Sequence, residues 1–297
     1  MYAGIEVGGT KLVCAVGTGP ADLGATRAFP TTTPQQTLGA AVSHLAEQQR
    51  RHGTITAIGV ASFGPVGVDQ TRADYGHVTA TPKPGWSGVD VVGWLRATFD
   101  VPVGFDTDVN GAALGEHRWG AARGLDTFAY VTVGTGIGGG GMAGGSLLHG
   151  LLHPEMGHLR VRRHPEDHYA GGCPFHGDCL EGLASGPAIA RRWGRPATEL
   201  GSDTEQAVAL EATYLAQLAA AITYLLSAQR IVLGGGVMKL PGLLEAVRRR
   251  TGALLGGYPD APELRSPLTT YLVPPGLGDR AGVLGAIALA EAAEHSA

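Results

Sequence analysis

Several features are scarce or missing in this chain of 297 residues, and each absence excludes a class of protein. Lysine and arginine form no long run, and the net charge is −4, so nucleic acid is not expected as a partner. No apolar run of about 18 residues is present, and the start "MYAGIEVGG" has no charged segment leading into an apolar one. We therefore expect no membrane span and no secretory leader, and a cytoplasmic location.

Cysteine is also scarce, with three in the chain. Two of them, Cys173 and Cys179, lie close together, with His176 midway between them. A cytoplasmic protein keeps its thiols reduced, which disfavours a disulfide between the two. A metal site and a catalytic cysteine–histidine pair stay open as explanations of this cluster.

What the chain has in quantity is glycine, with 48 residues and no Gly-X-Y period. Hydrophobic residues make up 44% and charged residues 16%, which indicates a globular fold with a large core. A chain of this length predicts two lobes. The glycines cluster where loops are expected, at places where the backbone must approach another group closely.

Strand-like and helix-like segments alternate along the chain, which predicts an α/β fold. The start reads as a hairpin, "YAGIEV" and "LVCAVG" joined by "GGTK". A helix with apolar residues at helical spacing follows over 34–51, then a buried strand in "TITAIGVASFG" and another in "VPVGFD". Further helices are predicted at 89–99, 202–228, 240–255 and 279–294.

A second strand–glycine turn–strand pattern begins at "TFAYVTVG", with "TGIGGGG" as the turn and a strand near "MAGGSLLHG". It repeats the start of the chain and predicts two related lobes with a cleft between them. We place a small N-terminal lobe at 1–107, completed by the last helix at 279–297. A larger lobe at 108–278 would hold the cysteine cluster and a nucleotide site.

Three glycine-rich turns follow predicted strands: "EVGGTK", "VGTGIGGGG" and "LGGGVMK". Glycine lets backbone N–H groups converge on an anion because no Cβ blocks the approach. Gly134, Gly136 and Gly139 match G-x-G-x-x-G, but a strand follows them where a dinucleotide site needs a helix. A G-x-x-x-x-G-K-[ST] loop is absent. Two such hairpins and a later glycine turn instead resemble the ATP site of the sugar kinase, actin and chaperone-ATPase class.

"FDTDVNGAALGE" places Asp106 and Asp108 at a strand-to-helix junction. An aspartate there can cap the helix. It can also act as the general base that phosphoryl transfer to a hydroxyl requires. The position of Asp108 between the two predicted lobes favours the second role.

Cys173, His176 and Cys179 supply three ligands within residues 173–179, and such soft or borderline donors favour Zn²⁺ over Mg²⁺ or Ca²⁺. Spacing does not select the fourth ligand from the upstream histidines, which are His149, His153, His158, His164 and His168. The turn-like "CPFHGDC" is too closed for an exposed nucleophilic thiolate. Four protein ligands would make the zinc structural, because they leave no open position for water.

In this order the motifs "EVGGTK", "ASFGPVG", "TDVNGAALGE", "VGTGIGGG", "EMGH", "CLEG" and "LGGG" resemble the ROK family of repressors and sugar kinases. The forms "TPKPGW", "LLHPEMGH" and "GGCPFHGDCLEGLASGPA" resemble its bacterial fructokinase branch. The resemblance covers nearly the whole chain. It implies the two-lobed, actin-like ATPase fold with ribonuclease H-like repeats, and a homodimer.

The resemblance also implies roles for individual residues. Asp108 would be the base that deprotonates the C6 hydroxyl of fructose for attack on Mg²⁺-bound ATP. Sugar hydroxyls would be bound by Glu155, His158 and Glu181, and His158 would complete the zinc site with its other ring nitrogen. The nucleotide would be bound by Gly8, Gly9, Thr10, Lys11, Thr135, Gly136, Pro187, Gly235, Gly236, Val237, Met238 and Lys239.

Two positions depart from the family pattern. Glu6 stands where the wider family has aspartate, and Thr107, which we assign to the sugar side, stands where glucokinase-like members have asparagine. The rival interpretations are a kinase for mannose or glucose, a sugar-sensing regulator and a catalytically silent sugar-binding protein. A regulator would need a DNA-binding module ahead of the core, but the first core strand is predicted to begin at Tyr2.

Overall fold

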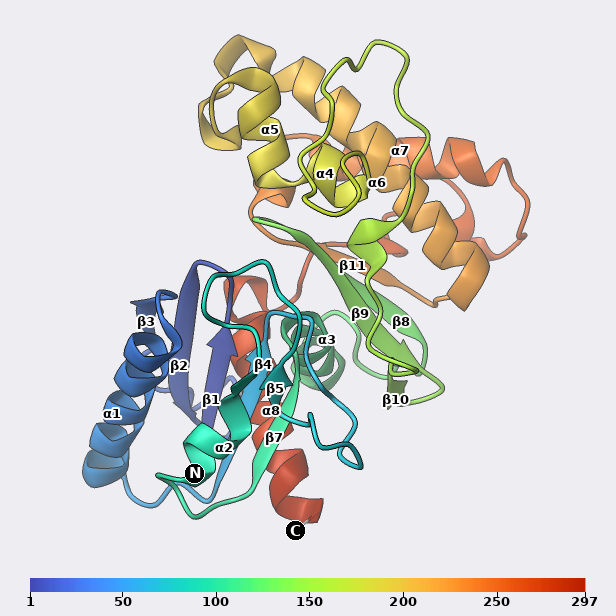
Figure 1. Ribbon diagram of the computed structural model, residues 1–297. Helices are drawn as coiled ribbons and strands as arrows, with labels where there is room; N and C mark the ends of the chain where they lie inside the picture. The colour runs from blue at the N-terminus through green and yellow to red at the C-terminus, as the bar shows by residue number, and fades with distance from the viewer. Residues whose placement is uncertain (297) are drawn as a thin grey trace. The chain divides into compact units, whose positions relative to one another are not determined.

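The computed structural model describes residues 1–296 and forms two compact units (Figure 1). The first unit combines Met1–Arg123 with Leu147–Pro154 and the C-terminal segment from Asp279. The second combines Gly124–Ser146 with Glu155–Gly278. The sequence set the boundary at 107/108, whereas the contacts group residues 108–123 with the first unit.

The first unit is built on a five-stranded sheet in the order β3-β2-β1-β4-β7. The hairpin strands are antiparallel, and β4 and β7 run parallel to β1. The strands are β1 Tyr2–Val7, β2 Lys11–Gly17, β3 Arg27–Pro30, β4 Ala57–Ser62 and β7 Val103–Thr107, with a small ladder of β5 His77–Val78 and β6 Val89–Asp90. The helices are α1 Pro34–His52, α2 Val91–Arg96, α3 Asp108–Trp119 and α8 Ala281–Ser296.

The second unit repeats this topology with the sheet order β10-β9-β8-β11-β12. An antiparallel hairpin is again followed by two parallel strands. The strands are β8 Phe128–Val133, β9 Ile137–Ala143, β10 Ser146–Leu147, β11 Ile231–Gly234 and β12 Leu272–Val273; the helices are α4 Leu180–Ala184, α5 Gly186–Trp193, α6 Thr204–Leu226 and α7 Leu243–Leu255. The predicted α/β fold with two related halves is confirmed.

One predicted turn is shorter than expected. The run "IGGGG" was assigned to a turn, but Ile137–Ala143 is strand β9 and pairs residue by residue with β8. The glycines fit there because of close packing: a Cβ on Gly139 would lie 2.5 Å from the sulfur of Met156. Pairing and packing have overridden the weak strand propensity of glycine.

Helix α6 has the length and apolar composition to cross a membrane. Instead it packs against α7 and contributes Tyr214, Leu215 and Leu218 to the core of the second unit. A helix of this kind is what a large α/β core requires.

In the first unit, the two faces of the sheet are covered differently. Ile5, Val60 and Phe105 lie on the face that packs with α1 and α2. The opposite face has glycine at three positions that are aligned across adjacent strands: Gly4 on β1, Gly59 on β4 and Gly104 on β7. A Cβ on Gly4 would lie 2.8 Å from the carbonyl oxygen of Val283 in α8. This glycine row therefore lets the backbone of α8 lie directly on the sheet.

Helix α3 is held through the same helix. A Cβ on Gly115 would lie 2.9 Å from both the Ala281 oxygen and the Gly285 nitrogen of α8. The N-terminus of α3, which follows β7, is thus fixed by the sheet on one side and by α8 on the other. That N-terminus is Asp108.

We predict that Gly59→Ala destabilises the protein by about 2–3 kcal/mol through overpacking. The added methyl would lie 2.6 Å from the Ala290 nitrogen and closer still to the Ala286 oxygen. The matched control is Gly39→Ala in α1, where a Cβ meets nothing within 4 Å and alanine favours the helix. Urea denaturation of both variants measures the difference, and equal stabilities would contradict the described packing.

Candidate active site and metal centre

The β1–β2 hairpin of the first unit presents the predicted phosphate loop. Gly8 donates its N–H to the carbonyl of Lys11 at 2.9 Å, which closes the turn. Thr31 donates its hydroxyl to Gly8 O and Lys83 donates to Gly9 O, so the carbonyls of the turn are already engaged. Gly9, Thr10 and Lys11 are exposed. The tip is free to present backbone N–H groups to an anion.

Glu6, at the position where the family has aspartate, lies against the first turn of α8. Its carboxyl fills the place where a Cβ on Gly282 would lie. Burial raises the pKa of Glu6, Lys11 opposes the rise and Asp279 adds to it. The longer acid is accommodated because α8 has glycine at this position.

The β7–α3 junction holds Asp108, which is partly exposed, and Thr107, which is buried. Thr107 caps α3: its hydroxyl oxygen accepts the N–H of Asn110 at 3.1 Å. Asp108 accepts the N–H of Val109 through Oδ1 at 2.9 Å. The cap fixes the direction of the first turn and with it the direction of the Asp108 carboxylate.

In the second unit, the predicted nucleotide segments meet. Gly186, at the start of α5, donates its N–H to the carbonyl of Gly134 at 2.7 Å, next to the exposed Thr135. Pro187 is the second residue of that helix. A Cβ on Gly235 would lie 2.6 Å from the nitrogen of Val133, at the end of β8. Turn, helix start and third glycine loop thus form one surface.

The run from Gly235 to Lys239 has two kinds of residue. Gly235 has a φ of +94°, and Gly236, Met238 and Lys239 are exposed or partly exposed. The side chain of Val237 is buried in the core. Only the backbone of Val237 is therefore placed to face a ligand.

The predicted sugar residues of the second unit lie beside this surface. Glu181 accepts the N–H of Ile137 through Oε2 at 2.9 Å, which joins α4 to the β8–β9 turn just after Gly136. Glu155 and His158 flank the 3₁₀ turn Met156–His158, with Glu155 Oε2 4.0 Å from His158 Nε2. Glu155 and His158 are thus brought together, and Glu181 is tied to the glycine turn.

The four predicted metal ligands converge. The candidate ligand atoms of His158, Cys173, His176 and Cys179 all lie within 4.8 Å of one another. His158 Nδ1 lies 3.5 Å from Cys179 Sγ and 3.7 Å from Cys173 Sγ, and His176 Nδ1 lies 3.6 Å from Cys173 Sγ. In a tetrahedral zinc site with ordinary bond lengths, sulfur and nitrogen ligands are about 3.6 Å apart. The donors and their spacing fit zinc.

The backbone brings the ligands together through short-range structure. Cys173 and Gly177 exchange hydrogen bonds around a tight turn that holds His176, and Gly177 has a φ of +65°. Cys179 is the N-cap residue of α4. His158 directs Nδ1 toward the cysteines and Nε2 toward Glu155, so one ring can serve both a metal and a polar ligand.

The alternatives for the cysteine cluster fare worse. All three cysteines, Cys14, Cys173 and Cys179, are free and buried. Burial raises the pKa of the Cys179 thiol to about 11, so without a bound cation it is not a thiolate nucleophile at neutral pH. The remaining histidines have other places: His149 contacts Asp106, His153 Nε2 accepts the N–H of Val66, and His168 is exposed.

Comparison with known proteins agrees with this geometry. The family model described as "ROK family" matches residues 2–293. The chain belongs to the ROK family. It is 45% identical over 298 residues to a fructokinase from Zymomonas mobilis, a match that covers 99% of this chain and 98% of that protein.

Two solved structures are similar to this ROK protein along their whole length. A ROK hexokinase from Thermus thermophilus has a TM-score of 0.79 and 28% identity, covering 100% of this chain and 99% of the other. A ROK glucokinase from Streptomyces griseus, solved with glucose and AMPPNP, has a TM-score of 0.78 and 25% identity, covering 98% and 99%. The fold is therefore the two-lobed, actin-like ATPase fold of ROK sugar kinases.

Sequence reasoning missed the anchor of the metal loop, the segment 159–178 between ligands. Asp167, buried in this loop, accepts hydrogen bonds from Arg192 of α5 at 3.0 and 3.1 Å and from Tyr214 of α6 at 2.5 Å. Arg192 also donates to Leu183 O and lies 3.4 Å from buried Glu211. The loop is thus held to the helices at a point that involves no metal ligand.

The charges of this anchor are set by its contacts. Burial alone would raise the pKa of Asp167, but the hydrogen bonds from Tyr214 and Arg192 outweigh it and hold the pKa below its usual range. Burial raises the pKa of Glu211 well above its usual range. The signal in the sequence was an aspartate within an otherwise irregular loop, which does not name its partners.

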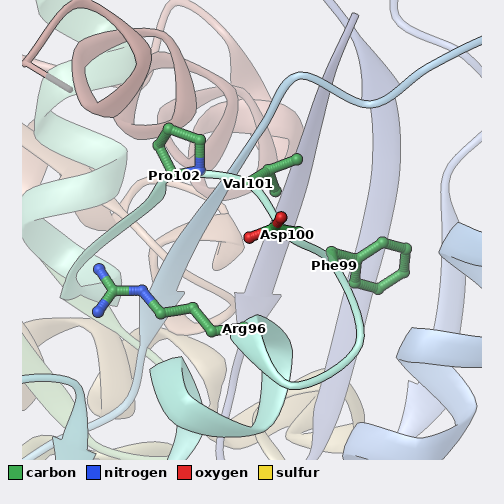
Figure 2. A pocket seen from close by; sticks show the side chains of 5 residues that line it. All are labelled: Arg96, Phe99, Asp100, Val101 and Pro102. Atoms are coloured by element: carbon green, nitrogen blue, oxygen red, sulfur yellow. The ribbon is translucent and has the colours of Figure 1, made fainter.

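A separate hollow of about 300 Å³ lies at the opposite end of β7 from Asp108 (Figure 2). Figure 2 shows that the segment leading from α2 into β7 lines it. The lining residues are Arg96, Phe99, Asp100, Val101 and Pro102. It has no part in the candidate site, and Asp100 serves below as a control position.

We predict that Asp167→Asn destabilises the protein by about 3 kcal/mol, because Arg192 loses its main charge partner in a buried site. The stabilisation by Asp167 is complete above its ordinary pKa of about 3.9 and is lost as pH falls through its lowered folded value. Thermal unfolding between pH 3 and 7 measures both effects. Glu166→Gln, at an exposed neighbour in the same loop, is the control; a loss no larger than in this control would contradict the anchor.

Proposed function

We propose that this ROK protein is a fructokinase that transfers the γ-phosphoryl group of ATP to the C6 hydroxyl of D-fructose. The observation that carries the proposal is the 45% identity to a fructokinase over the full chain. The glycine turns, a partly exposed aspartate at a strand end and the Glu155–His158 pair supply the parts that such a reaction needs.

Asp108 acts as the general base in this proposal. Its carboxylate accepts the proton of the C6 hydroxyl as that oxygen forms a bond to the γ-phosphorus. The bond between the γ-phosphorus and the bridging oxygen breaks, and ADP leaves. Mg²⁺ neutralises the phosphate charge, and the backbone N–H groups of the hairpin at Gly8–Lys11 and of the turn at Thr135–Gly136 bind the phosphates.

The remaining assignments follow the same division. Glu155, His158, Glu181 and Thr107 would lie on the sugar side, and Pro187 with residues 235–239 on the nucleotide side. Zinc would be held by His158, Cys173, His176 and Cys179 and would serve a structural role, because four protein donors leave no open position. Two lobes, one completed by the C-terminal helix, a homodimer and a cytoplasmic location belong to the proposal.

A second candidate is the same reaction on glucose or mannose. It is favoured by the similarity to the glucokinase that was solved with glucose and AMPPNP. Epimers differ by a few hydrogen bonds in the pocket, so pocket shape alone does not separate them. A panel of hexoses in a coupled ADP-release assay separates the candidates: fructose should give the highest kcat/KM, and a higher value for glucose or mannose would favour the rival.

Asp108→Asn should lower kcat by about 100-fold or more, since the amide cannot accept the proton. The cap by Thr107 stays in place, so the fold should be retained. Steady-state assays with fructose and ATP, together with circular dichroism, test this. Asp100→Asn in the distant hollow should keep wild-type kcat; near-normal turnover in Asp108→Asn would remove the assigned base.

Removal of zinc should lower the melting temperature by about 5 °C or more and weaken fructose binding in the same preparation, because the metal holds His158 in place. The measurements are zinc content, thermal melting and fructose affinity before and after treatment with a chelator. Cys173→Ser, which lacks one ligand, should no longer respond to the chelator. A wild-type melt indifferent to metal removal would refute the structural zinc.

A further inference from the structure

A buried carboxylate lies two residues before the proposed base. Asp106 is 2% exposed and ends the β7 row that faces α8, next to Ala61 of β4. Its Oδ1 accepts the N–H of Thr107 at 2.7 Å and the side-chain amide of Asn110 at 2.9 Å. The role assigned to Asp108 makes no use of this residue.

The third donor to Asp106 is a histidine from a distant part of the chain. His149 Nε2 lies 2.8 Å from Asp106 Oδ2. Of the three donors, His149 is the one that can carry a positive charge. A buried carboxylate is costly unless it is paired and hydrogen-bonded, so His149 offsets the cost of the Asp106 charge.

The same segment is attached at two more points. Asn110 donates from its side-chain amide to Leu148 O at 3.3 Å, and His153 Nε2 accepts the N–H of Val66 at 3.1 Å. Residues 147–154 are therefore fastened to α3 and to the loop after β4. His149 is fixed in place by its own segment before it meets Asp106.

We propose that His149 is a positioning residue for Asp108: through Asp106 it holds the β7–α3 junction and compensates the negative charge next to the base. This inference rests on the proposed function. Asp106 binds Thr107 N–H and Asn110, the two residues that form the cap of α3. Any loosening of Asp106 therefore alters the direction of the Asp108 carboxylate.

The charge effect has a definite sign. While His149 is protonated, the pair with Asp106 is neutral, and Asp108 has no uncompensated carboxylate beside it. Without that charge, Asp106 repels the ionised form of Asp108 and raises its pKa. The hydrogen bond to Asp106 raises the pKa of His149 above its ordinary value. The ion pair is thus complete below about pH 6.5 and is lost as pH rises through the raised value.

Other charged groups face the pair. Asp69, Arg72 and Asp74 line the same hollow of about 350 Å³ as His149, and Tyr75 lies close enough to sense the charge of Asp106. Asp74 is bonded to Arg72, and Asp69 accepts two hydrogen bonds from Thr71. These groups are engaged with one another, and His149 is the residue bonded to Asp106.

The first experiment measures the pair without using activity. The imidazole of His149 is titrated by NMR in the full-length protein and in Asp106→Asn. We expect a pKa above that of a free histidine in the wild type and a fall in the variant. If Asp106→Asn does not fold, the wild-type titration and His149→Gln decide. A wild-type His149 pKa at or below the ordinary value would overturn the pairing.

The second experiment reads the effect on catalysis. His149→Ala should lower kcat about tenfold with little change in KM for ATP, and His149→Gln, which keeps an N–H donor, should restore most of kcat at neutral pH. In both variants the acid limb of the kcat/KM profile should move to higher pH by about half a unit or more. His52→Gln, at the exposed end of α1, is the control and should change neither.

The outcomes separate the two proposals. If Asp108→Asn is inactive but His149→Ala has wild-type kcat and an unshifted acid limb, the positioning role falls and the fructokinase assignment stands. If Asp108→Asn keeps its turnover, the proposed base falls, and the positioning role falls with it. A lower kcat that His149→Gln fails to restore, without a shift of the limb, would mean a purely structural role and would overturn the inference.

Discussion

The contact on which the first unit depends is that between α8 and the row formed by Gly4, Gly59 and Gly104. Three adjacent strands give up side chains at one level, and the helix backbone takes their place. The same helix receives α3 through Gly115 and Gly285. A strand end and a helix start are thereby held at a fixed separation, and Asp108 lies at their junction. Backbone-to-backbone packing of this kind leaves little room for adjustment.

The second unit reaches comparable order by different means. Its irregular segment 159–178 has little hydrophobic material of its own, and two polar fixings replace a core. One is the cluster of His158, Cys173, His176 and Cys179, and the other is Asp167 with its partners on α5 and α6. The two fixings involve different residues. The Glu155–His158 pair lies at the end governed by the ligand cluster.

Much of this architecture could be predicted from the sequence, because it depends on local signals. Hairpin glycines, helical periodicity and the spacing of Cys173, His176 and Cys179 all act over short distances. The predictions that needed more were those set by distant contacts. The strand at Ile137–Ala143 is decided by pairing with β8, and α3 joins the first unit because it packs on a helix about 170 positions later. The fourth metal ligand and the partner of Asp106 were two histidines among several, and only the fold distinguishes them.

The place of α8 in the chain has a consequence for biosynthesis. A chain made from its N-terminus exposes the sheet of the first unit early, yet the helix that covers its glycine face is the last element to leave the ribosome. Residues 124–146 and 155–278 are complete before that. Because domains generally fold as their chain becomes available, the first unit to begin is the last to be finished, and its bare sheet face must wait through the synthesis of the second.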